Sequence, residues 1–190
     1  MKKYLFAAAS LLSLGLTASP ALAQDQSPDG SKAFGIEPYV AVMAGRHEFD
    51  TEVLKSGIPP VGYSGTIIEG LAGVNVPLGA FFVGAEGSVA KGVDGDIDWS
   101  YGAAGRAGAR VGESGLIYGK VGYQWVNFDA LGNNSPDYDG MLYGFGVEVG
   151  PKDIGLGGVT GQSGIRLRME VQTFDDFGSL RPTAGIVAHF

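Results

Sequence analysis

The sequence predicts an all-β chain, an eight-stranded antiparallel up-and-down transmembrane β-barrel. Segments of about ten residues alternate between apolar and polar side chains, which is typical of strands with one buried face. Glycine accounts for 33 of the 190 residues and recurs inside apolar segments. Beyond residue 23, no stretch is apolar for the roughly 18 residues that a spanning helix needs, although 45% of the chain is hydrophobic. Strands that cross a membrane explain these observations together.

Residues 1–23 are predicted to be a secretory signal peptide. They begin with Lys2 and Lys3, continue with an apolar stretch and end in the small-x-small pattern of Ala21 and Ala23, so we expect cleavage after Ala23. A single membrane anchor is the alternative, but the apolar stretch is short and Ser and Thr interrupt it. Residues 24–36 are polar and rich in turn formers, which predicts a flexible leader before a barrel domain over residues 37–190.

Charge and cysteine content exclude several classes of protein. Without the two lysines of the signal peptide, 11 basic residues stand against 20 acidic ones, and the net charge moves from −7 to −9. This acidic balance argues against nucleic acid as a partner. The chain has no cysteine, which excludes disulfides and a lipid-modified N-terminal cysteine.

The first two predicted strands are the least clear. In the first, Arg46 and Glu48 should face the polar side, yet Val40 and Val42 share their parity. The second is weaker than those that follow, with Glu69 on its polar face. The eight predicted strands cover residues 39–49, 66–76, 81–90, 99–111, 117–127, 141–149, 165–173 and 180–190.

The fourth predicted strand shows the alternation most clearly. Trp99 and Tyr101 share one face with small residues and valine, whereas Arg106 and Arg110 lie on the other face. The third, fifth, sixth and seventh segments repeat this pattern, each with apolar residues opposite charged or small ones. The last segment, LRPTAGIVAHF, has an apolar face that ends on Phe190. An even strand number is expected of an antiparallel barrel with both chain ends on one side.

The links between the predicted strands differ in length on the two sides of the barrel. On one side, residues 77–79 and 112–115 are tight turns, and 150–164 is an unexpectedly long third link. On the other side the links are longer on average and rich in aspartate; they cover residues 50–65, 91–98, 128–140 and 174–179. Short periplasmic turns and longer outer loops give this asymmetry, so we expect four acidic loops on the outer surface.

The charged residues of the polar faces indicate which face points inward. Both signs are mixed and most lie beside glycine or alanine, which fits a crowded lumen in which buried charges pair. A soluble barrel such as a lipocalin is the alternative, with an apolar interior and charges in water. The predicted lumenal charge network consists of Glu69, Glu86, Arg106, Arg110, Lys120, Glu148, Arg166, Arg168, Glu170 and Arg181.

Aromatic residues on the opposite faces favour the membrane alternative. They would be hard to pack inside a small barrel, but they suit the aromatic girdles at a lipid interface. The predicted interface aromatics are Trp99, Tyr101, Tyr123, Trp125 and Tyr143, and Tyr138 is a further candidate.

Several stretches resemble a known family. They are LIYGKVGY (116–123), YGAAGRAGARVG (101–112), FFVGAEGS (81–88) and the terminal aromatic. Over residues 37–190 the chain resembles the small eight-stranded outer-membrane barrels of the OmpA/OmpX and opacity-protein type, in the porin family. The resemblance implies a place in the cell outer membrane, in contact with its lipid. It also implies that Phe190, Ala188 and Ile186 form the assembly signal read by the barrel-assembly machinery; the alternative is that Phe190 packs at the barrel rim.

Few residues are available for chemistry. His47 and His189 are the only histidines, so we expect no catalytic, cofactor-binding or metal-binding residues and no enzyme. A Ser-His-Glu arrangement around His47 is the alternative, but no serine is marked as its partner. The run from Asp94 to Asp98 lacks the glycine of a calcium loop, because Trp99 stands in its place.

The predicted function is a non-enzymatic barrel that serves envelope structure or surface interaction through its loops, whose extracellular partner the sequence does not identify. Lumenal charges locked in ion pairs would make the barrel a solid peg, since an eight-stranded interior is just wide enough for side chains to fill. Alternatively, a rearranging network of Glu86, Arg106, Lys120 and Glu148 would gate a narrow pore for ions or small solutes.

Overall fold

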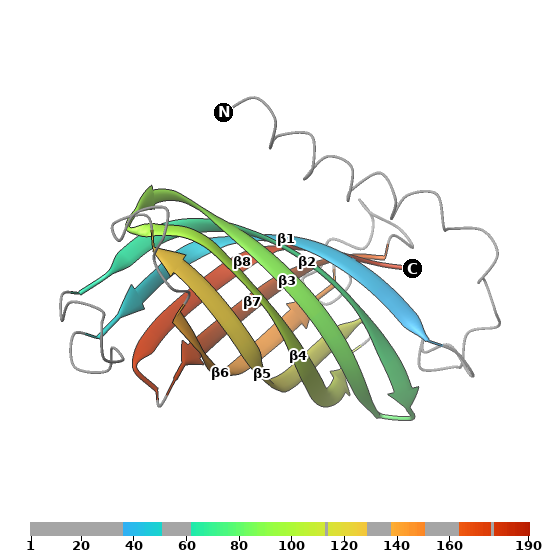
Figure 1. Ribbon diagram of the computed structural model, residues 1–190. Coiled ribbons are helices and arrows are strands. Elements are labelled where there is room, and N and C mark those ends of the chain that lie inside the picture. Colours follow the sequence, from blue (N-terminus) through green and yellow to red (C-terminus); the bar gives the residue numbers. More distant parts are fainter. Residues whose placement is uncertain (1–35, 51–61, 113, 129–137, 151–163, 176) are drawn as a thin grey trace.

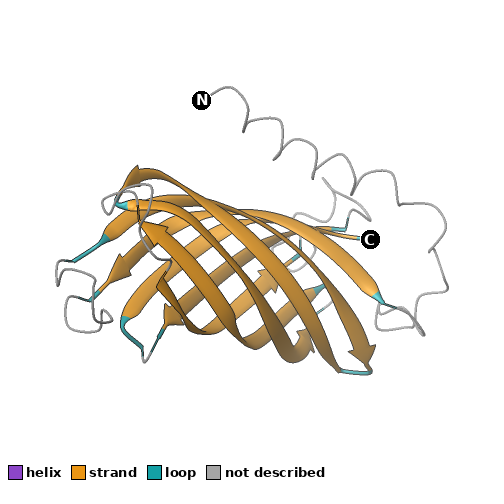
Figure 2. Cartoon of the chain, in the orientation of Figure 1, coloured by secondary structure: helices purple, strands orange, loops and turns teal. Residues whose placement is uncertain are grey.

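The computed structural model describes residues 36–50, 62–112, 114–128, 138–150, 164–175 and 177–190. Within them, each strand pairs antiparallel with its neighbours, and the first strand pairs with the last to close the barrel (Figures 1 and 2). This confirms the predicted eight-stranded up-and-down topology. The strands are β1 (Glu37–Phe49), β2 (Ser64–Leu78), β3 (Phe81–Gly95), β4 (Ile97–Val111), β5 (Gly115–Phe128), β6 (Tyr138–Val149), β7 (Ile165–Phe174) and β8 (Ser179–His189). No helix among the described residues has the length and hydropathy of a membrane span.

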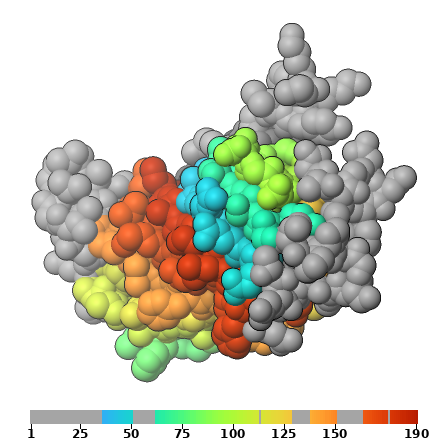
Figure 3. All heavy atoms as spheres, turned by 90° about the vertical axis from the view of Figure 1, so that its left-hand side faces the viewer, coloured from blue at the N-terminus to red at the C-terminus, as the bar shows by residue number. Residues whose placement is uncertain are grey.

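The barrel has two distinct ends. We call the end at which β1 begins and β8 finishes the terminus end, and the opposite end the loop end; Figure 1 shows them on its right and left. Tight turns join β2 to β3 and β4 to β5 at the terminus end, where Gly79 and Gly112 have φ angles of 69° and 70°. Such positive φ angles favour glycine because it has no Cβ. Viewed from the loop end, the cyan β1 and red β8 lie side by side (Figure 3).

Strand register fixes how the barrel is staggered. Following the paired residues around the barrel from Glu37 leads across seven strands to Arg181 on β8. Arg181 lies opposite His47, between the pairs Gly45–Thr183 and Glu48–Leu180, and His47 is ten residues beyond Glu37 on the same strand. With eight strands, this stagger corresponds to a strand tilt of about 40°.

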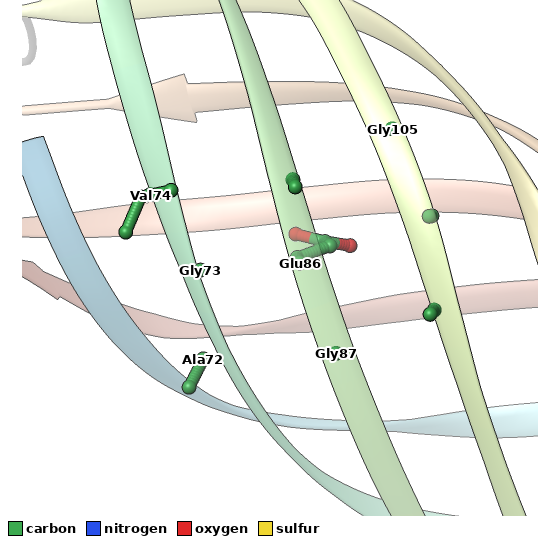
Figure 4. Close-up of a pocket in the computed structure, with 9 residues that line it drawn as sticks. Ala72, Gly73, Val74, Glu86, Gly87 and Gly105 are labelled. Carbon is green, nitrogen blue, oxygen red and sulfur yellow. The ribbon is translucent and has the colours of Figure 1, made fainter. Parts of the chain in front are cut away.

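The outward face of the barrel is apolar over most of its height. Its large side chains include Phe81, Val121, Phe145 and Val171, each 47–63% exposed. Over β2, β3 and β4 the outer wall is shallowly hollowed, because small residues occupy it (Figure 4). The inward face carries the polar side chains, so the period-two alternation separates two environments.

Three expectations about individual residues are wrong. Residues 91–98 are not a loop, because β3 and β4 continue to Gly95 and from Ile97, with a tight turn in which Gly95 has φ of 90°. Arg46 and Glu48 face outward, since the inward positions of β1 carry the opposite parity. Tyr138 faces inward and is 2% exposed, so it belongs to no interface girdle.

Several expectations lie outside the described residues. These are the signal peptide at 1–23, almost all of the leader at 24–36, and much of the links at 50–65, 128–140 and 150–164.

Candidate functional site

The ten charged residues predicted for the lumen all lie on the inward face of the barrel. Eight of them are buried, and Arg110 and Arg166 near the terminus end keep slightly more exposure. With Glu37, the described lumen holds six cationic side chains and five carboxylates, apart from its two histidines. The barrel therefore gathers charges from all eight of its strands into one nearly balanced interior.

Two carboxylates form the centre of this network. Glu86 on β3 pairs with Lys120 on β5 at 2.8 Å and with Arg168 on β7 at 2.9 Å. Glu170 pairs with the same two cations, at 2.5 Å each. The Tyr118 hydroxyl donates to Glu170 at 2.6 Å. Four charges of alternating sign therefore neutralise one another across the lumen, which offsets much of the cost of burying them.

A second group of contacts lies closer to the terminus end. Glu148 on β6 pairs with Arg106 at 2.9 Å and with Nε2 of His189 at 2.7 Å, while Arg166 approaches it at 3.8 Å. Arg106 Nε also donates to Asn75 at 2.9 Å. These contacts tie the last strand to the middle of the barrel.

Two isolated ion pairs complete the set of predicted charges. Arg110 pairs with Glu37 at 2.6 Å at the terminus end, and Arg181 pairs with Glu69 at 2.6 Å towards the loop end. Every predicted lumenal residue thus has an oppositely charged neighbour within 4.0 Å.

Aromatic rings line the part of the lumen that we call the charged layer, which holds Glu86, Arg106, Lys120, Glu148, Arg168 and Glu170. The Arg106 guanidinium lies 4.1 Å from the ring centre of Tyr39, 4.8 Å from Tyr118 and 5.4 Å from Phe82. The Tyr39 hydroxyl donates to Glu86 at 2.7 Å. Ring faces attract cations, so these residues hold Arg106 in a fixed position. Phe82 shares the parity of Glu86 on β3, and Tyr118 that of Lys120 on β5. Tyr39 has no such signal, because the alternation of the first strand was ambiguous.

The loop end of the lumen is filled by a different kind of cluster, which the sequence reasoning missed. We call it the aromatic plug; it consists of Phe49, Tyr63, Ile67, Ala90, Ile97, Val126, Phe128, Tyr138 and Phe174, all 0–6% exposed. Phe49 meets Phe128 edge to face at 5.2 Å between ring centres, and Tyr63 lies 4.7 Å from Phe128. Tyr138 meets Phe174 at 5.1 Å. Towards the loop end, the charged layer is therefore followed by a packed apolar layer.

His47 has a serine partner that the sequence did not reveal. Its Nε2 lies 3.1 Å from the Ser179 hydroxyl, 132 residues away along the chain. The neighbouring Glu48 points outward and pairs with Arg46 at 2.8 Å, so it cannot orient His47 as the acid of a triad. Both His47 and Ser179 are buried, and the Ser179 hydroxyl also accepts the backbone N–H of Phe174. The arrangement fits a buried structural hydrogen bond.

The five predicted interface aromatics face outward on three adjacent strands. They are Trp99 and Tyr101 on β4, Tyr123 and Trp125 on β5, and Tyr143 on β6. Tyr101 stacks on Trp125 at 5.3 Å, and Tyr143 stacks on Phe177 at 5.4 Å. The group lies near the loop end, and Lys91 sits 4.8 Å above the Trp99 ring.

The last strand places the predicted assembly-signal residues on the outer wall. Ile186 is 59% exposed and Ala188 shares its parity. The Phe190 N–H donates to the Pro38 carbonyl at 2.9 Å, next to the start of β1. Among the described residues, no group of three metal-binding side chains lies close enough to hold a metal ion.

The chain is similar in fold to solved membrane barrels. No protein-family model and no curated protein match it. The attachment invasion locus protein Ail of Yersinia pestis shares 14% identity over 81% of this chain and 95% of its own, with a TM-score of 0.47. Neisserial surface protein A shares 12% over 82% and 99%, also at 0.47. A de novo designed transmembrane β-barrel shares 10% over 80% and 95%, at 0.46. The eight-stranded antiparallel topology of this chain rests on its own strand pairing.

Proposed function

We propose that this chain is a non-enzymatic outer-membrane β-barrel that serves envelope structure or surface interaction. The observation that carries the proposal is the division of the closed barrel into an apolar outer wall and a charged, ion-paired interior. A soluble barrel has the reverse arrangement, whereas a small outer-membrane barrel needs this one.

The height of the apolar wall supports membrane insertion. At about 3.3 Å per residue and a tilt of about 40°, the outward residues from Trp99 to Val111 on β4 cover roughly 30 Å along the barrel axis. This length matches an apolar band of about 25 Å with an aromatic girdle at one edge. Arg46 and Lys91 lie on the outer wall close to the loop end, where a polar lipid headgroup region would begin.

The paired lumenal charges, together with the aromatic plug, favour a closed and non-conducting barrel over the narrow-channel alternative. The four charges proposed to gate a pore, on Glu86, Arg106, Lys120 and Glu148, are held in mutual contacts with their side chains 0–2% exposed. The lipocalin-like alternative needs an apolar cavity beneath a charged outer face, which is the opposite of this wall.

Export and assembly complete the proposal. Residues 1–23 direct export, and the outward stripe of β8 with Phe190 is the segment offered to the barrel-assembly machinery. The links at the loop end would face the outside of the cell and contact an extracellular partner.

Membrane fractionation and gel mobility test the proposal. We would express the full chain in a Gram-negative host, separate the membranes, and run the purified protein in detergent with and without boiling. We expect the protein in the outer-membrane fraction, with a band that shifts on heating because a closed barrel resists detergent until heated. A periplasmic protein without a heat shift would overturn the proposal.

A further inference from the structure

The charged layer contains buried polar atoms that the protein itself does not satisfy. Among the described residues, Arg106 Nη2, Arg168 Nη1, Asn75 Nδ2 and Gln172 Oε1 are buried without a hydrogen-bond partner in the protein. Each such atom costs about 1–3 kcal/mol if it stays dry, and more on a charged group. Ordered water is the usual partner of such atoms in a polar interior. The pattern therefore indicates a hydrated layer.

Water can reach this layer more easily from one end than from the other. At the terminus end the side chains of Arg110 and Arg166 remain 13% and 15% exposed. The buried apolar residues Phe82, Leu116 and Val187 also lie towards this end, but they belong to two smaller clusters than the plug. His189 and Glu37 lie at the same end. At the loop end, the lumen is filled by the aromatic plug. An apolar constriction excludes water and ions by dewetting, whereas a charged mouth admits them.

We propose that the lumen is a hydrated vestibule that exchanges water and small ions with the terminus end alone, and that the aromatic plug, rather than the ion pairs, is the barrier to conduction. The inference rests on the membrane placement proposed above. It assigns the seal to a layer distinct from the charge network, so the two can be altered separately.

Single cysteines provide a direct test, because the chain has none of its own. Ser88 faces the lumen on β3, two residues before Ala90 of the plug, and S88C places a thiol just below the seal. D50C and A80C mark the loop and terminus sides, since both positions are exposed. Each variant is reconstituted in sealed vesicles and treated with a small, charged, membrane-impermeant thiol reagent on one side at a time.

We expect S88C to react only from the side that labels A80C. In S88C with F49A and F128A, we expect the rate from the side that labels D50C to rise roughly tenfold or more, together with conductance in planar bilayers. F82A serves as the matched control, because it truncates a buried aromatic outside the plug and should leave the loop side sealed. Heat-shifted mobility verifies that each variant is folded.

Four results would contradict the inference. The first is reaction of S88C from the loop side with the plug intact. The second is no reaction from either side in the folded protein, which would mean a dry lumen. The third is a folded plug variant in which S88C still does not react from the loop side and which shows no conductance. The fourth is labelling of D50C and A80C from the same side in every vesicle, which would overturn the membrane placement as well, and so separates the two failures. The sidedness of S88C decides the question even if the plug variant does not fold.

Discussion

The charged layer and the aromatic plug occupy the same barrel interior and are equally buried, but opposite chemistry holds them together. Glu86, Lys120, Arg168 and Glu170 neutralise one another, and each depends on the others being present. The plug residues, such as Phe49 and Phe128, interact through packing of rings and leave no charge behind when one is lost. A buried side chain in this lumen therefore stabilises the barrel either through the charge that it neutralises or through the space that it fills.

Removing a charge from the network should have the largest effect. E86L removes one of the two carboxylates that Arg168 and Lys120 share, and it takes away the acceptor of the Tyr39 hydroxyl. Breaking a buried ion pair from one side costs about 3–5 kcal/mol, because the remaining charge stays buried. Reversible urea unfolding in lipid vesicles, followed by tryptophan fluorescence, measures this loss. An effect below about 1 kcal/mol would mean that solvent or neighbouring carboxylates replace Glu86.

Truncating the plug should have a somewhat smaller effect. F128A removes a ring that contacts Phe49, Tyr63 and Tyr138 and leaves a cavity, so we expect a loss of about 3 kcal/mol in the same unfolding measurement. F81A is the matched control, since Phe81 is 63% exposed on the outer wall and contributes nothing to the plug. Equal effects of F128A and F81A would show that the plug is no more tightly packed than the outer wall.

The alternation of residues was sufficient to predict the barrel and its charged lumen, but not the plug. Glu86, Arg106 and Lys120 stand out in the sequence because charges in an otherwise apolar strand must face one common interior. Phe128, Tyr138 and Phe174 keep the inward parity of their strands, but they lie just beyond the predicted strand bounds. Phe49 lies on the first strand, where the alternation was ambiguous. The side chains of these four residues meet because the loop ends of β1, β5, β6 and β7 surround the same lumen.

The ambiguous features of β1 have a related explanation. Arg46 and Glu48 lie on the outward face of β1 at the loop end. They are polar although they face outward, because the apolar wall ends at this height of the barrel. The contact between His47 and Ser179 depends on β1 pairing with β8 and on the stagger of the barrel. Neither property can be read from local sequence patterns, because both follow from closure of the whole sheet.

Replacing both members of a lumenal ion pair should distinguish the contribution of charge neutralisation to stability from the contribution of the space that the side chains fill. Glu69 and Arg181 pair at 2.6 Å, apart from the central group. E69L and R181M alone should each cost about 3–5 kcal/mol, whereas the double variant should lie within about 1 kcal/mol of the parent, since no unpaired charge remains. A double-mutant cycle in vesicles measures the coupling. If the double variant lost as much free energy of unfolding as the two single variants together, the pair would contribute through contacts other than neutralisation.

The outward ion pair on β1 should matter least, although its geometry resembles that of the lumenal pairs. Arg46 and Glu48 lie 2.8 Å apart, close to the distances in the network, but their side chains are 55% and 57% exposed. Water or lipid headgroups can solvate either charge when its partner is removed, so E48Q should change stability by less than about 0.5 kcal/mol, and raised salt should weaken even that effect. Urea unfolding of E48Q beside E86L makes the comparison, because both remove one carboxylate from a cation at nearly equal distance. If E48Q proved as costly as E86L, burial would not be what distinguishes the lumen, and the reason for placing these charges inside the barrel would have to be sought elsewhere.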